Sequence, residues 1–178
     1  MFFGQDQRKY LNVQSGLLKP DSKNIQIYSW ALYDWANSAF ATAVMAGFFP
    51  VFFRQVWSGT AEVTTITFRL GLANSIASVL LVVFAPILGA VSDKALMKKR
   101  FLLFFMLLGV VMTGTLSFIS GGEYFLAAVV YIFATLGFML GNVIYDALIL
   151  FVASSERLDS ISALGYALGY IGGGIFFA

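Results

Sequence analysis

The sequence contains no cysteine and no histidine, and its charged residues are few. Without cysteine the chain can form neither disulfides nor thiolate metal sites, and without histidine it lacks the side chain that most readily titrates near neutral pH. We therefore expect no metal site and no cofactor, and any proton chemistry must fall to carboxylates. Charged residues make up 11% of the 178 residues, against about 25% in a soluble domain. Water is consequently not the main solvent of this chain.

Apolar residues dominate the composition. They account for 60% of the chain, the mean hydropathy is +0.85, and there are 19 Phe and 17 Gly. We predict an all-α membrane protein of about five transmembrane helices, since each needs about 20 residues, with the chain ending within the fifth. Residues 1–27 are polar and lack the apolar core of a signal peptide, which predicts a cytoplasmic tail; residues 28–178 form a helical bundle in the lipid bilayer. The predicted helices cover residues 28–53, 68–91, 101–119, 124–152 and 163 onward.

Basic residues are sorted to one side of this predicted bundle. The tail holds four of the 11 Lys and Arg residues, the loop at residues 89–100 holds four, and the segment 154–162 holds one. Lys and Arg resist translocation, so these three segments are expected on the cytoplasmic face and the protein is multi-pass with a cytoplasmic N-terminus. Because the basic residues form no single patch, nucleic acid is not expected as a partner.

The first predicted helix contains Asp34, a carboxylate inside a hydrophobic segment. Such a residue is costly in a membrane and is a functional candidate by default. Small and polar residues follow it at helical spacing and form a stripe that faces a water-filled cavity or a neighbouring helix. The alternative is that Asp34 caps the positive end of the helix dipole and reaches to the membrane surface. The other residues of the stripe are Asn37, Ser38, Ala41, Thr42 and Met45.

The fourth predicted helix carries a second carboxylate, Asp146, near the depth of Asp34. Two buried carboxylates at one level form a coupling pair or parts of a gate, or else are two separate caps at the membrane surface. Burial disfavours the charged form of a carboxyl group, which would permit proton exchange, and a carboxylate there would favour the amine of a solute. The residues on the same helix face are Tyr131, Thr135, Phe138, Asn142 and Tyr145.

Glycines repeat every four residues in the fifth predicted helix, at Gly165, Gly169 and Gly173. Small residues at this spacing allow close helix packing, whereas a phosphate-binding loop would need a preceding strand. Gly137 and Gly141 form a similar pair in the fourth helix. Small residues also follow one side of the second helix, and for them we prefer packing to solute contact.

Three stretches of the sequence resemble a known family. Gly89, Asp93 and Lys94, followed by three further basic residues, resemble the loop signature of the major facilitator superfamily. Residues 33–53 and 162–174 resemble its vacuole-effluxer branch, which is related to fungal autophagy-related amino-acid effluxers and to bacterial proteins. The resemblance begins near Tyr28 and covers the first five helices of a fold that normally has twelve, and it implies the inner membrane of a bacterium.

The resemblance implies alternating access, in which two helical bundles rock about a central site. The first and fourth helices would line the cavity, and the second and fifth would pack against the other half of the protein. It also implies that Asp93 holds a cytoplasmic gate, with Gly89 in the same signature and Lys94 and Arg100 as supporting charges. The alternative is that these loop residues only set the orientation of the chain.

The sequence thus predicts a secondary transporter of small solutes, amino acids among them, that depends on a missing C-terminal half or a partner subunit. Protons are a candidate coupling ion. The alternative is a membrane protein without transport activity, either a decayed fragment or an accessory subunit that docks through its glycine-rich helix faces. An enzyme is not expected, since no nucleophile is paired with a base. The candidate solute or proton contacts are Asp34, Asn37, Asn142, Tyr145 and Asp146.

Overall fold

The chain folds into a bundle of long helices. The computed structural model describes residues 20–91 and 95–177, and no strand occurs within those ranges. The first helix is continuous through four segments, and a short 3₁₀ turn precedes the last helix. The elements are α2 (Pro20–Ala39), η1 (Phe40–Phe48), α3 (Phe49–Phe52), η2 (Phe53–Trp57), α4 (Val63–Val91), α5 (Ala95–Leu116), α6 (Tyr124–Val152), η3 (Ser155–Arg157) and α7 (Leu158–Phe177).

Four of these helices are long and apolar enough to cross a membrane by length and composition, which confirms the prediction of an all-α membrane protein. The fifth predicted span forms the 20-residue helix α7 but is not among the four. Its first turn holds Asp159, and its serines, glycines and tyrosines lower its hydropathy. The four candidate spans are Lys23–Trp57, Val63–Ala90, Met97–Leu116 and Tyr124–Val152.

The helix boundaries agree best with the predictions at α6, which covers residues 124–152 as expected. The first helix begins at Pro20 and not at Tyr28, because proline fits the first turn of a helix, where its missing N–H needs no partner. Residues 20–27 of the predicted tail are therefore helical, and residues 1–19 lie outside the described residues. The first helix is also π-helical at η1 and η2, on either side of Pro50, which cannot donate a backbone hydrogen bond.

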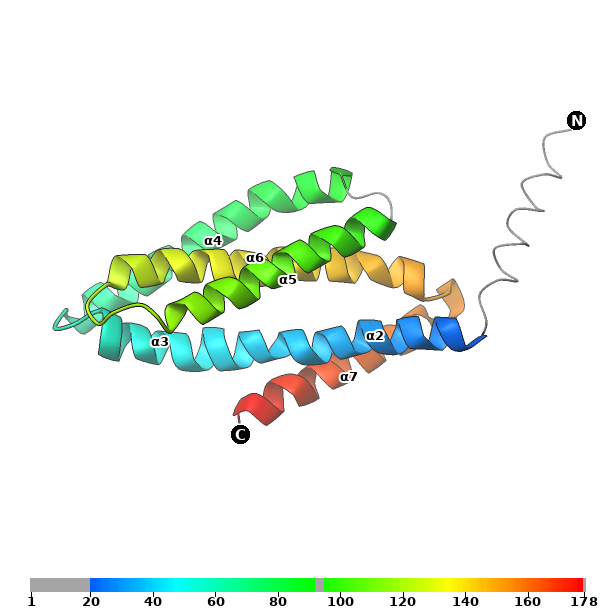
Figure 1. Ribbon diagram of the computed structural model, residues 1–178, viewed down its shortest axis with the longest axis horizontal. Coiled ribbons are helices and arrows are strands. Elements are labelled where there is room, and N and C mark those ends of the chain that lie inside the picture. Colours follow the sequence, from blue (N-terminus) through cyan, green and yellow to red (C-terminus); the bar gives the residue numbers. More distant parts are fainter. Residues whose placement is uncertain (1–19, 92–94, 178) are drawn as a thin grey trace, which may run out of the picture.

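α6 is the central helix of the bundle. In an apolar 18-residue window of its candidate span 56% of the residues are buried, against 11% in the corresponding window of each of the other three. Figure 1 shows α5 crossing over α6, and α6 packs along α5, α4 and the first helix. At Gly137 the contact with α5 is so close that a Cβ atom would lie 2.6 Å from the backbone nitrogen of Gly109. Gly141 of the predicted pair lies beside Tyr33 of α2 and Phe105 of α5.

One end of the bundle is held together by aromatic stacking and loop hydrogen bonds. Phe49 stacks on Tyr131 of α6 with ring centroids 3.6 Å apart, and the Tyr131 hydroxyl donates to Asn74 of α4 at 3.1 Å. The indole N–H of Trp57 donates to the carbonyl of Ile119, in the loop between α5 and α6, at 3.2 Å. These contacts fix α4, α5 and α6 to the first helix at this end, and the candidate site lies toward the other end.

Candidate solute cavity

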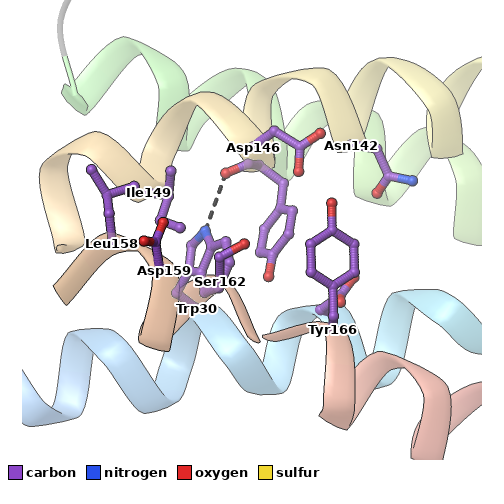
Figure 2. A pocket seen from close by; sticks show the side chains of 10 residues that line it. Trp30, Asn142, Asp146, Ile149, Leu158, Asp159, Ser162 and Tyr166 are labelled. Carbon is purple, nitrogen blue, oxygen red and sulfur yellow. Dashed lines mark hydrogen bonds between the residues drawn. The ribbon is translucent and has the colours of Figure 1, made fainter. Parts of the chain in front are cut away.

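A cavity of about 390 Å³ lies between α2, α6 and the first turns of α7. Figure 2 shows the side chains that line it. Four of the five residues predicted to contact a solute or a proton are among them, and only Asn37 is not. The lining residues are Trp30, Asp34, Asn142, Tyr145, Asp146, Ile149, Leu158, Asp159, Ser162 and Tyr166.

Stacked aromatic rings join α2 to α6 at this cavity. Trp30 stacks on Tyr145 with ring centroids 4.4 Å apart and an interplanar angle of 9°, and Tyr33 stacks on Tyr145 at 5.1 Å. The Trp30 indole N–H donates to the backbone carbonyl of Tyr145 at 3.1 Å, the bond drawn in Figure 2. Tyr145 is only 4% exposed, and its hydroxyl has no hydrogen-bond partner in the described part of the chain.

Three carboxylates line the cavity, and no Lys or Arg is among its lining residues. Asp34 is half-buried on α2, whereas Asp146 on α6 and Asp159 on α7 are exposed. The prediction that Asp146 is buried is wrong within the described residues, because the cavity is open beside it. Asp34 lies far from the N-terminus of its helix at Pro20, which excludes the alternative that it caps that end.

Asn37 does not line this cavity but is hydrogen-bonded to Asn142, which does. Its side-chain N–H donates to the amide oxygen of Asn142 at 2.6 Å, and Asn37 itself lines a separate, mostly apolar cavity of about 450 Å³ between the first helix, α5 and α6. The residues of the polar stripe predicted on the first helix therefore contact two different helices, α6 and α7. Asn37 contacts α6, and Thr42 donates to the carbonyl of Gly173 on α7 at 3.0 Å.

The glycine repeat of α7 lies against the first helix of the same chain. A Cβ atom at Gly165 would lie 2.5 Å from the Trp30 ring, and one at Gly169 would lie 2.5 Å from a carboxylate oxygen of Asp34. Gly173 lies beside Thr42 in the same way. This edge of α7 thus packs within the chain, whereas the resemblance implied that the fifth helix packs against the other half.

Comparison with known proteins identifies the family. Residues 58–159 match the family described as vacuole effluxer Atg22-like. The chain belongs to this family, a branch of the major facilitator superfamily. The matched range holds α4, α5, α6 and the start of α7, and so includes Asn142, Tyr145, Asp146 and Asp159 of the cavity.

Two curated relatives are similar over most of the chain. It is 38% identical over 151 residues to the uncharacterized MFS-type transporter YxiO of Bacillus subtilis (strain 168), and the match covers 84% of this chain and 35% of YxiO. It is 26% identical over 153 residues to an uncharacterized protein of Aquifex aeolicus (strain VF5), with 86% and 37% covered. The chain thus spans about a third of the length of these relatives. No solved structure matches it.

The family loop that follows α4 is only partly described. Gly89 is exposed in α4, with open space where a Cβ atom would lie. Arg100 is exposed on α5. Asp93 and Lys94 lie outside the described residues, so their predicted role in a gate stays a prediction.

Three residues that line the cavity could not be assigned to it in the sequence analysis: Asp159, Ser162 and Tyr166. The sequence predicts that the last helix begins at residue 163, whereas α7 begins at Leu158 and so includes Asp159 and Ser162. Asp159, Ser162 and Tyr166 are spaced i, i+3 and i+7, which places them on one helix face. If the helix is extended toward the N-terminus from the glycine repeat, this spacing predicts that the three residues share a face.

Proposed function

We propose that the chain forms part of a secondary transporter that moves small solutes across the membrane by alternating access. Membership of the Atg22-like family supports this function, and the relative YxiO is named as an MFS-type transporter. The observation that carries the proposal is the cavity of about 390 Å³ that contains Asp34 from α2 and Asp146 from α6. Carboxylates within a membrane bundle are costly and characteristically mark solute or ion pathways.

In this proposal Asp34 and Asp146 bind a proton or the amine of a solute. Asn142 and the Tyr145 hydroxyl supply further hydrogen-bonding groups beside them, and Asn37 orients Asn142 through its 2.6 Å hydrogen bond. Amino acids are one solute class that these groups accommodate. Asp93 and Lys94, together with Arg100 near the start of α5, act as the cytoplasmic gate.

Alternating access requires a second helical bundle, and α4 offers a surface for it. Gly71 is exposed with open space where a Cβ atom would lie. Ser75 and Ser78 are exposed on the same helix, and their hydroxyls donate to the carbonyls of Gly71 and Asn74 at 2.8 and 2.9 Å. These hydroxyls are already bonded within the helix and need no partner. The side chains on this face are short, which suits close packing of another helix. The same face supports the second candidate function, an accessory subunit that docks on a transporter.

Counterflow into proteoliposomes tests the proposal. The gene product that contains this chain is reconstituted, and exchange of radiolabelled leucine and of radiolabelled 3-methylbutylamine is measured. We expect Asp34→Asn and Asp146→Asn each to lower exchange of the transported probe by about tenfold or more, since each removes a charged contact. Glu62→Gln, an exposed carboxylate ahead of α4 and outside the cavity, is the matched control.

Two results would contradict the transport proposal. If exchange is unchanged in both Asp34→Asn and Asp146→Asn, the cavity is not part of the transport pathway. If neither probe exchanges faster than in empty liposomes, and the protein instead copurifies with a second membrane subunit, the accessory function is favoured.

A further inference from the structure

We infer that the cavity between α2, α6 and α7 selects amines that carry no carboxylate over amino-acid zwitterions. This inference rests on the proposed function, because it names the solute class for the same cavity. It narrows that function from small solutes in general to organic cations of roughly amino-acid size.

The charge of the cavity is the first observation. Asp34, Asp146 and Asp159 line it without any Lys or Arg. Asp34 is half-buried, and a carboxylate partly removed from water is stabilised by a cation or by several hydrogen-bond donors. An ammonium group finds acceptors here on all three helices. The carboxylate of a zwitterion would instead meet three groups of its own charge.

The Tyr145 hydroxyl is the second, independent observation. Tyr145 lines the cavity, is only 4% exposed, and its hydroxyl has no hydrogen-bond partner in the described part of the chain. Buried polar groups are nearly always paired, so an unpaired one on a residue that lines a cavity calls for a water or a solute as its partner. An ammonium group has three N–H donors and no acceptor, which suits the lone pairs of this oxygen. An anion could also accept from the hydroxyl, but the surrounding carboxylates disfavour one.

Aromatic rings complete the site. The Trp30 N–H is already bonded to the Tyr145 carbonyl, so Trp30 offers a solute only its ring. Figure 2 shows Tyr166 pointing from α7 toward α6, across the cavity. Aromatic faces attract ammonium groups. The volume of about 390 Å³ is near the low end of the range for small-molecule sites, about 300–1,000 Å³, which favours a small amine.

Isothermal titration calorimetry with three matched probes tests the inference. The purified gene product is titrated with 3-methylbutylamine, leucine and 4-methylpentanoate, which share one branched carbon chain and differ in charge. We expect the amine to bind about tenfold or more tightly than leucine, and the acid to give no binding heat. Leucine binding as tightly as the amine, or more tightly, would overturn the inference.

Variants locate the binding. Asp34→Asn and Asp146→Asn should each weaken amine binding by about tenfold, whereas Glu62→Gln should leave it unchanged. Tyr145→Phe keeps the stacked ring and should weaken amine binding while raising the melting temperature, since it removes a buried unpaired hydroxyl. Circular dichroism reports whether each variant is folded. Amine binding that is unchanged in all three cavity variants would overturn the inference.

The two proposals fail in different ways. If the amine binds as expected but neither probe exchanges in proteoliposomes, the transport proposal fails and the amine site stands. If leucine is preferred and its exchange still depends on Asp34 and Asp146, the amine inference fails and the transport proposal stands.

Discussion

At the scale of single residues, the hydrogen bond between Asn37 and Asn142 joins α2 to α6 directly beside the cavity. Hydrogen bonds between transmembrane helices contribute about 0.6 kcal/mol on average and about 1.7 kcal/mol at most. We predict that a double-mutant cycle of Asn37→Ala and Asn142→Ala gives a coupling free energy of about 0.6 kcal/mol. Unfolding in sodium dodecyl sulfate followed by circular dichroism measures it. A coupling of zero would contradict the bond.

Gly172 gives a second test at the residue scale. A Cβ atom there would collide with the backbone carbonyl of Trp35 on α2, whereas Gly174 has open space. We predict that Gly172→Ala lowers the free energy of unfolding by about 1–3 kcal/mol, because backbone atoms cannot move aside as a side chain can. Gly174→Ala is the control and should be neutral or slightly stabilising. Equal stability of both variants would show that α7 does not pack this closely on α2.

The residues of the cavity could be predicted where a polar side chain interrupts an apolar helix. Asp34, Asn142 and Asp146 stand out in the sequence for this reason, and all three line the cavity. Trp30 could not be predicted in the same way, since its role depends on stacking with Tyr145, which is 115 positions later in the chain. Aromatic residues are common throughout these helices, and pattern alone does not distinguish a stacked indole from one that faces lipid.

At the scale of elements, the burial of α6 sets it apart from the other helices. Ile144 is 2% exposed and Leu150, on the same helix, is 68% exposed. We predict that Ile144→Ala lowers the free energy of unfolding by about 2 kcal/mol or more, since it leaves a void in the packed interior. Leu150→Ala should cost less than about 0.5 kcal/mol. The same detergent unfolding measures both, and similar losses at the two positions would contradict the central place of α6.

The type and extent of the helices could be predicted from apolar runs, most accurately for residues 124–152, where loops with glycine and serine mark both ends. The π-helical segments of the first helix could not. A π-helix shifts the backbone hydrogen bonds by one residue without changing the composition, so hydropathy does not reveal it. Helix α7 was predicted to begin too late, since Leu158 and Asp159 resemble loop residues when only hydropathy is considered.

At the scale of the whole molecule, the predicted topology can be tested with single cysteines in a cysteine-free form of the gene product, and residues 1–178 contain no cysteine to remove. Thr60→Cys and Ser155→Cys place single thiols at exposed positions in the connections before α4 and before α7. From the distribution of basic residues we predict that a membrane-impermeant maleimide labels the Thr60→Cys variant in intact cells. The Ser155→Cys variant should be labelled only after the cells are permeabilised. The opposite pattern would reverse the predicted orientation.

Which helices pack together could not be derived from the sequence alone. The glycine repeat of α7 predicted a close helix partner, but not that the partner is α2 of the same chain, because small residues fit any smooth helix surface. Long-range packing of α6 and α7 on α2 brings Asp34 together with Asp146 and Asp159, which come more than a hundred positions later in the chain. This packing creates a shared cavity from two separate polar stripes.

The most direct test of the central claim, that this cavity binds solute, uses Ser162, which lines it and is half-buried. In a cysteine-free form of the gene product, Ser162→Cys is labelled with N-ethylmaleimide, with and without 3-methylbutylamine or leucine, and Thr60→Cys serves as the control. We predict that the Ser162→Cys thiol is labelled and that one of the probes slows this reaction without affecting the thiol of the Thr60→Cys control. Labelling of the Ser162→Cys variant at the same rate with and without both probes would contradict it.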